Sequence, residues 1–337
     1  MGGMRGSSRR FAATLVAIGV LSVAVGVSGG ASGSDAPCGS TARAAHPAST
    51  TSLGTGARGA QGRLTSTTVK GMPSRVAVIV MENKECGDVI GSAAAPFING
   101  LARHYALARA MYGLTHPSLP NYLALTGGST FGINSDCTDC SAGDSTSIVD
   151  QLERANISWK AYMEGLPHPC FTGAGAGEYA KRHDPLVYYR RVVNNRSWCA
   201  HIVPLTELGA DERAGSLPRF IWITPNLCHE MHDCSVAAGD RFLSSLVPRV
   251  LRSLGAHGVL FITWDEGTSD SGCCRLASGG HVATIVAGPG AKPGAQLNTP
   301  TDHYSLLQTV EDLFGLPRLR AAACACTHSL TPLLAAG

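Results

Sequence analysis

Two pairs of acidic or amide side chains stand directly after apolar runs of the chain: Glu82 with Asn83, and Asp265 with Glu266. Oxygen donors of this kind suit hard cations such as Ca²⁺, Mg²⁺ or Mn²⁺ better than zinc. Neighbours on a strand point to opposite faces, so the chain must bend after the strand if both members of a pair are to face one ion. The pairs therefore predict one divalent metal site. The alternative is that they are solvated residues at strand ends.

A serine that could act as a nucleophile precedes a helical stretch. Ser118 is followed by Leu-Pro-Asn and then by apolar residues, which predicts a helix that begins near the serine. The free N–H groups of such a helix start favour an anion such as phosphate, and coordination to the metal would activate the hydroxyl. Asn121 could donate to a phosphoryl oxygen. The alternative is that Ser118 is a simple helix cap.

Four histidines could serve the same chemistry: His229, His232, His281 and His303. They lie near the ends of predicted elements, where they could hydrogen-bond a phosphoryl group or protonate the leaving alcohol. The spacing of the first two would also allow zinc binding on a helix, but their loop context does not favour it. We expect His183 and Asp184 to be outer contacts only.

Short apolar runs rich in β-branched residues must position these side chains: 76–81, 220–224, 259–264 and 282–288. They do not alternate in polarity, as expected of strands that are covered on both faces. Helical patterns lie between them, at 239–254 and 302–313. This alternation predicts an α/β fold with a doubly wound, mostly parallel sheet sandwiched by helices. Ligands bind at the carboxyl ends of such strands, so both acidic pairs should converge on one crevice.

Composition favours an exported protein and argues against nucleic-acid binding. The 337 residues include 27 Lys+Arg and 24 Asp+Glu, a formal net charge of +3, which leaves no dense basic face. The 12 cysteines are typical of an oxidising compartment and allow six disulfides, so we expect a disulfide-stapled fold. The Cys137-x-x-Cys140 pair is interpreted as a disulfide rather than a zinc site.

The chain divides into three segments. Residues 1–31 combine basic residues, an apolar run and small residues, which predicts a secretory signal peptide and a secreted protein; Arg9 and Arg10 hint at twin-arginine export. An uncleaved signal would instead leave the protein in the cell envelope. Residues 32–72 are rich in Gly, Ser, Ala and Thr, which predicts a disordered linker. Residues 73–334 form the predicted folded domain, without a further membrane span, and we expect a monomer.

Six blocks in order resemble the phosphoesterase family, which includes bacterial phospholipases C and acid phosphatases and is similar in fold to alkaline phosphatase: 81–83, 115–128, 224–233, 264–267, 279–282 and 303–317. The resemblance implies a phosphoric ester hydrolase with a Ser118 nucleophile, a phosphoserine intermediate and a phosphate contact at Asn121. It also implies one metal ion, held by Glu82, Asn83, Ser118, Asp265 and Glu266. The two-zinc relatives have Asp-His where this chain has Asp-Glu, which favours a single hard ion over zinc.

The resemblance leaves the substrate open. We expect a phosphatase acting on small phosphorylated substrates, phosphoinositides included. The alternative is a phospholipase C that cleaves phosphodiesters at phospholipid head groups. Longer phospholipases of this family carry extra β-domains, whereas this chain ends about 20 residues after the last block, which favours the phosphatase. A non-catalytic secreted binding protein on the same fold would have lost Ser118, Glu82 or Asp265, and all three are present.

Overall fold

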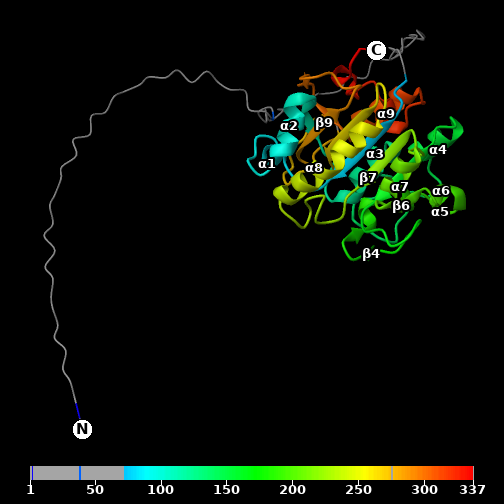
Figure 1. Ribbon diagram of the computed structural model, residues 1–337. Helices are drawn as coiled ribbons and strands as arrows, with labels where there is room; N and C mark the ends of the chain where they lie inside the picture. Colours follow the sequence, from blue (N-terminus) through cyan, green and yellow to red (C-terminus); the bar gives the residue numbers. More distant parts are fainter. Residues whose placement is uncertain (1, 3–37, 39–71, 275, 337) are drawn as a thin grey trace, which may run out of the picture. The chain divides into compact units, whose positions relative to one another are not determined.

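The computed structural model describes Gly2, Cys38, 72–274 and 276–336, and its described residues from Cys38 onward belong to one compact unit (Figure 1). The predicted signal peptide, apart from Gly2, and most of the predicted linker lie outside the described residues. Cys38, within the linker range, forms a disulfide with Cys86 at the start of helix α1 (Cys86–Val89). Residue 38 is therefore covalently tied to the folded domain.

The centre of the domain is a sheet whose strand order is β10-β2-β9-β8-β1-β7-β3-β6, with β11 paired to β2. The four predicted strands are all present: β1 (Val76–Met81), β7 (Phe220–Thr224), β8 (Val259–Trp264) and β9 (His281–Ala287). Strand β1 pairs in parallel with both β7 and β8. Every residue of these four strands is buried, so both faces of the sheet are covered, as a doubly wound fold requires.

Strand β9 departs from the parallel pattern, because it runs antiparallel to β8 and to β2 (Ala106–Tyr112). A parallel neighbour needs a crossover connection, usually a helix, and the described residues of the loop 265–280 form none. The sequence did not predict β2 or β3 (Trp159–Met163), where Arg109 and Lys160 interrupt the apolar runs. Both side chains are only partly buried, as expected near the margins of a sheet.

Helices pack in pairs against the sheet (Figure 1): α2 (Pro96–His104) contacts α8 (Val236–Ser253), and α3 (Ser118–Gly127) contacts α9 (His303–Phe314). Ser235 caps α8, and a capping box of Asp302 and Ser305 begins α9. Helix α9 ends at Gly315, whose positive φ of 64° is the usual helix-terminating conformation. The predicted helices at 239–254 and 302–313 are thus confirmed to within a few residues.

The remaining elements are short and lie mainly between β3 and β7. They are α4 (Ile148–Arg154), β4 (Gly175–Ala176), β5 (Tyr179–Ala180), α5 (Arg190–Val193), α6 (Arg196–Cys199), β6 (Ile202–Pro204), α7 (Glu207–Ala214), β10 (Gln296–Leu297) and β11 (Thr301–Asp302). Single 3-10 turns occur at Lys181–His183, Pro185–Tyr188, Arg320–Ala323 and Thr331–Leu333. Within the described ranges, no helix has the length and apolar character needed to cross a membrane.

All 12 cysteines are paired, which confirms the expectation of a disulfide-stapled fold. The six bonds are Cys38–Cys86, Cys137–Cys140, Cys170–Cys199, Cys228–Cys234, Cys273–Cys274 and Cys324–Cys326. Four of the six join cysteines no more than 6 residues apart. These bonds therefore constrain individual loops rather than distant parts of the domain.

Candidate active site

The two acidic pairs meet at one edge of the sheet, because β1 and β8 are parallel neighbours and end side by side. The backbone N–H of Asn83 donates to Asp265 Oδ1 at 3.2 Å, and its side-chain amide donates to Glu82 Oε2 at 2.9 Å. Glu82 and Asp265 are fully buried, and Glu266 is 5% exposed. The structure thus brings together all four residues that the sequence placed at this crevice.

A bend directly after β1 lets Glu82 and Asn83 face the same space. Asn83 has a φ of 51°, in the left-handed region that asparagine tolerates better than most residues. Without this turn, the two side chains would point to opposite faces of the sheet. The bend that the sequence pattern required after this strand is therefore present at Asn83.

Ser118 is the first residue of α3, and its hydroxyl points at the carboxylates. Its Oγ donates to Glu82 Oε2 at 3.0 Å and lies 3.4 Å from Glu266 Oε1. The residue before the helix is Pro117, whose side chain makes no capping hydrogen bond. The hydroxyl thus belongs to the carboxylate cluster and does not serve as the helix cap.

The cluster concentrates negative charge in a buried place. Burial, followed by repulsion from Asp265 and Glu230, raises the pKa of Glu82 well above its usual value. Burial and the charge of Glu266 do the same to the pKa of Asp265, and burial raises the pKa of Glu266 to about 8. These shifts mean that the folded chain, by itself, compensates the carboxylate charges poorly.

The residues of the cluster fit a divalent cation. Glu82 Oε1 and Asp265 Oδ2 are buried and have no hydrogen-bond partner among the described residues. Buried carboxylate oxygens without a donor are costly unless a cation faces them. The predicted ligand set of Glu82, Asn83, Ser118, Asp265 and Glu266 supplies the oxygen donors that hard cations prefer.

Sequence reasoning missed Glu230 and underestimated His183. His183 lies between two buried carboxylates: its Nδ1 is 2.7 Å from Glu230 Oε1, and its Nε2 is 3.3 Å from Glu82 Oε1. Glu82, His183 and His232 also offer ligand atoms within 4.8 Å of one another, which is a possible metal-binding triad. The position of Glu230, between two histidines after the end of β7, was a signal that could have identified it.

His116 is a second residue that the sequence did not single out. Its Nδ1 lies 2.7 Å from Glu266 Oε2, and its Nε2 lies 3.1 Å from the carbonyl oxygen of Ser269. The ring therefore links the segment that carries Ser118 to the loop after β8. Its contact fixes the orientation of the Glu266 carboxylate.

Asn121 holds the segment before Ser118 in place. Its Oδ1 accepts hydrogen bonds from the N–H groups of Leu114 and Thr115, at 2.8 and 3.2 Å. Its amide nitrogen donates to the carbonyl oxygens of Thr115 and Pro117. In this state both ends of the amide bind backbone, so the predicted phosphate contact would require one of these bonds to break.

Three of the four predicted histidines have partners other than the side chains of the cluster. His229 Nδ1 lies 2.9 Å from both oxygens of Glu164, and its ring stacks on Phe242. His281 Nε2 donates to the carbonyl oxygen of Arg109 at 2.8 Å, and His303 Nε2 donates to that of Asp265. Burial lowers the pKa of His303 to about 4 and also lowers that of His281. Both rings are therefore neutral at pH 7.

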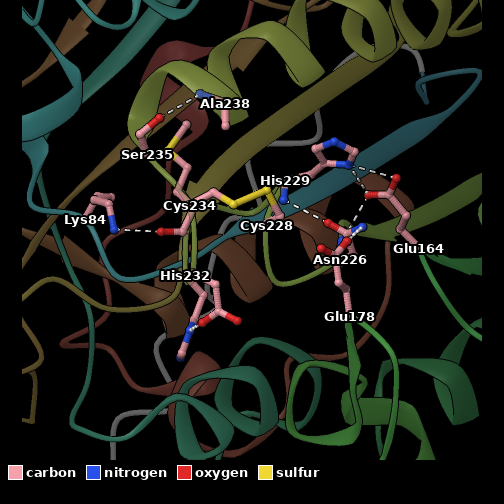
Figure 2. The surroundings of a disulfide bond; sticks show 12 residues. Lys84, Glu164, Glu178, Asn226, Cys228, His229, His232, Cys234, Ser235 and Ala238 are labelled. Atoms are coloured by element: carbon pink, nitrogen blue, oxygen red, sulfur yellow. Dashed lines mark hydrogen bonds and ion pairs between the residues drawn. A yellow bond between two sulfur atoms is a disulfide. The ribbon is translucent and has the colours of Figure 1, made fainter.

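A disulfide closes the loop after β7 that carries His229, Glu230 and His232. Cys228 and Cys234 bracket these residues, and Figure 2 shows His229 directed towards Glu164 and His232 on the other side of the loop. Asn226 Oδ1 accepts from the N–H of His229 at 2.8 Å, and Lys84 Nζ donates to the carbonyl oxygen of Met231 at 2.7 Å. The disulfide thus helps to hold Glu230 and His232 against the cluster.

Replacing Cys228 and Cys234 by serine is expected to reduce turnover before the fold is lost. A disulfide that closes so short a loop contributes about 2 kcal/mol to stability. The free energy of unfolding of a whole domain is larger than this, so the variant should still fold. Activity and far-ultraviolet circular dichroism, followed together on heating and reductant titration, check this expectation. The matched control replaces Cys324 and Cys326, which lie beyond α9. If the variant without Cys228 and Cys234 lost activity and ellipticity together, the disulfide would only stabilise the whole domain and would have no local role at the site.

The sheet and its helices have the same fold as solved proteins of the alkaline phosphatase superfamily. A solved protein of that superfamily from Vibrio parahaemolyticus superposes with a TM-score of 0.52, covering 76% of this chain and 71% of that one, at 12% identity. At this identity the likeness establishes the fold alone. It confirms the predicted fold class.

Sequence similarity identifies the family within this fold. The model of the phosphoesterase family matches residues 90–317, and the chain belongs to this family of phosphoric ester hydrolases. It is 32% identical over 253 residues to a phosphatidylinositol-3-phosphatase of Mycobacterium tuberculosis, covering 73% of this chain and 78% of that protein. It is also 31% identical to an acid phosphatase of Aspergillus fumigatus, covering 66% of this chain and 52% of the fungal enzyme.

Proposed function

We propose that this chain is a metal-dependent phosphomonoesterase in which Ser118 is the nucleophile and a phosphoserine is the intermediate. The observation that carries the proposal is the contact of a buried serine hydroxyl at a helix start with Glu82 and Glu266. The relatives named above as phosphatases favour a monoester substrate. Phosphoinositides are the candidate lipid substrates, because the mycobacterial relative is named for one.

The chain's own residues account for the bond changes. Ser118 Oγ attacks phosphorus as its proton passes towards the carboxylates of Glu82 and Glu266. The bond from phosphorus to the leaving alcohol breaks on the opposite side, and the imidazolium form of His232 protonates that oxygen and recovers its proton from the water of the second step. The side chain of His232 is 30% exposed, so the alcohol can leave to solvent. Water then attacks the phosphoserine and releases inorganic phosphate with restoration of the serine.

Glu82, Asn83, Ser118, Asp265 and Glu266 would hold one divalent cation. When bound, such an ion lowers the pKa of a hydroxyl nucleophile and stabilises negative charge on the phosphoryl group. Oxygen ligands favour Ca²⁺, Mg²⁺ or Mn²⁺. His183 and His232, beside Glu82, add nitrogen donors that manganese and zinc also accept. We propose a hard ion, with zinc as the competing outcome.

The proposal extends to the setting in which the enzyme acts. The signal peptide predicted at residues 1–31 and the six disulfides both support a secreted protein. We propose that it acts as a monomer on small phosphorylated substrates or phospholipid head groups and not on nucleic acid.

Hydrolysis of p-nitrophenyl phosphate and bis-p-nitrophenyl phosphate by the full chain tests the choice of substrate and metal. We expect the monoester to be cleaved faster, chelation to abolish turnover, and Ca²⁺, Mg²⁺ or Mn²⁺ to restore it. Preference for the diester would favour a phospholipase C instead. Restoration by Zn²⁺ alone would contradict the hard ion, and full activity in chelator would contradict metal dependence.

A further inference from the structure

A carboxylate of the chain itself occupies the start of α3, next to the proposed nucleophile. Asp136 Oδ1 accepts the backbone N–H of Leu119, the residue after Ser118, at 2.9 Å. Free N–H groups in the first turn of a helix are the groups that bind phosphoryl oxygens. Asp136 comes from the loop between α3 and α4, close to the Cys137–Cys140 disulfide. An internal anion thus takes a position suited to a substrate anion.

The guanidinium of Arg182 lies between the Asp136 carboxylate and His232, which is a member of the possible metal-binding triad. Its Nε lies 3.4 Å from Asp136 Oδ2, and its Nη2 donates to His232 Nε2 at 3.3 Å. The side chains of Arg182 and Asp136 are 26% and 31% exposed, so solutes can reach them. A planar guanidinium binds phosphate through two parallel hydrogen bonds, and both present partners of Arg182 are replaceable acceptors.

The contact with the N–H of Leu119 puts Asp136 next to Ser118, whose hydroxyl donates to Glu82. Glu82 Oε1 and His183 Nε2 are buried, 3.3 Å apart, and neither has a hydrogen-bond partner among the described residues. Unpartnered polar atoms of this kind, beside Ser118, indicate a place prepared for a ligand.

We propose that Asp136 is an internal stand-in for the substrate's phosphoryl group, and that Arg182 binds that group once the substrate displaces Asp136. The inference rests on the proposed function and assigns two further residues to the same site. Because Asp136 is negative, it opposes a phosphate dianion more strongly than a phosphodiester monoanion. It therefore weakens the hold on inorganic phosphate, the product, and tunes the selectivity between the two ester classes.

Calorimetric titration of inorganic phosphate into the full chain tests the stand-in directly. In a Ser118→Ala background, which prevents turnover, Asp136→Asn should tighten phosphate binding about tenfold, because one like charge is removed. Asparagine keeps the shape and an acceptor for the N–H of Leu119. Arg182→Gln should weaken binding by about tenfold or more, because the charged donor is lost. The matched control is Asp139→Asn, which removes the same charge from an exposed position on the same loop.

Kinetics with Ser118 intact provide a second measurement. Asp136→Asn should lower KM for p-nitrophenyl phosphate more than KM for bis-p-nitrophenyl phosphate, whereas Asp139→Asn should change neither. Circular dichroism verifies the fold, and Asp136→Ser replaces Asp136→Asn if the latter is unstable.

Three results would contradict the proposal in distinguishable ways. Weaker or unchanged phosphate binding in Asp136→Asn would show that the carboxylate supports the site or is irrelevant to it. Unchanged binding in Arg182→Gln would remove the role of the guanidinium. Absence of phosphate binding in every variant, together with turnover that survives Ser118→Ala, would instead overturn the proposed function itself.

Discussion

Replacing Ser118 by alanine should remove turnover while the fold survives. If the hydroxyl is the nucleophile, the loss is on the order of 10⁶ in rate, as when the nucleophile of a serine hydrolase is deleted. If it only supported the helix start, the change would cost about 1 kcal/mol of stability and leave turnover largely intact. Rate measurements on p-nitrophenyl phosphate, paired with thermal unfolding, separate these outcomes by several orders of magnitude.

Two further observations identify the atom that carries the phosphoryl group. Ser118→Thr should keep partial activity, because threonine retains the hydroxyl but adds a methyl group at a site where Ser118 is only 2% exposed. Acid quench after brief incubation with labelled substrate, followed by mass spectrometry of the 115–122 peptide, should show phosphate on Ser118. Phosphate on a histidine, with Ser118→Ala still active, would rule out the serine mechanism.

Replacing Glu82 by glutamine should have opposite effects on stability with and without the cation. In chelator, the variant should unfold at a higher temperature than the wild type, because it removes one of several buried carboxylates that repel one another. With Mn²⁺ or Ca²⁺ present, the wild type should gain several degrees and the variant almost none, since a ligand that binds only the folded state stabilises it. Turnover should fall by about 10³ or more if the ligand is essential.

Differential scanning fluorimetry across a cation titration measures this reversal without relying on activity. The control is Glu207→Gln, at the start of α7, which removes a carboxylate that is exposed. An equal rise in unfolding temperature for wild type and Glu82→Gln on adding the cation would show that Glu82 is not a ligand.

The strand residues that carry the site could be predicted because their sequence signals are local. A buried strand of a doubly wound sheet is apolar on both faces, so 76–81 and 259–264 stood out, and the polar residues that follow them marked their ends. Ser118 was recognisable for a similar reason, since it precedes an apolar helix. Parallel pairing of β1 with β8 then placed Glu82 beside Asp265 without further information.

The partners of these residues could not be predicted in the same way. Glu230 and Asp136 lie in loops, and His183 ends a single 3-10 turn. The path of these segments depends on disulfides and on packing with distant residues, and no periodic pattern marks such positions. The direction of β9 could not be predicted either, because it depends on the connection from β8, in whose described residues no helix forms. Asn121 illustrates the limit: its side chain lies next to the nucleophile's segment, but only the three-dimensional structure shows that it binds the backbone before Ser118.

The sequence by itself determined the fold class, the family and the residues with reactive side chains, because hydrophobic pattern and residue type are properties of the chain alone. The tertiary structure decided which atoms meet. It directed the Ser118 hydroxyl to Glu82, set His183 between two carboxylates, and laid Asp136 across the start of α3. Hydrogen bonds and charge interactions act over a few ångströms, so their partners are fixed only when residues far apart in the sequence are folded together.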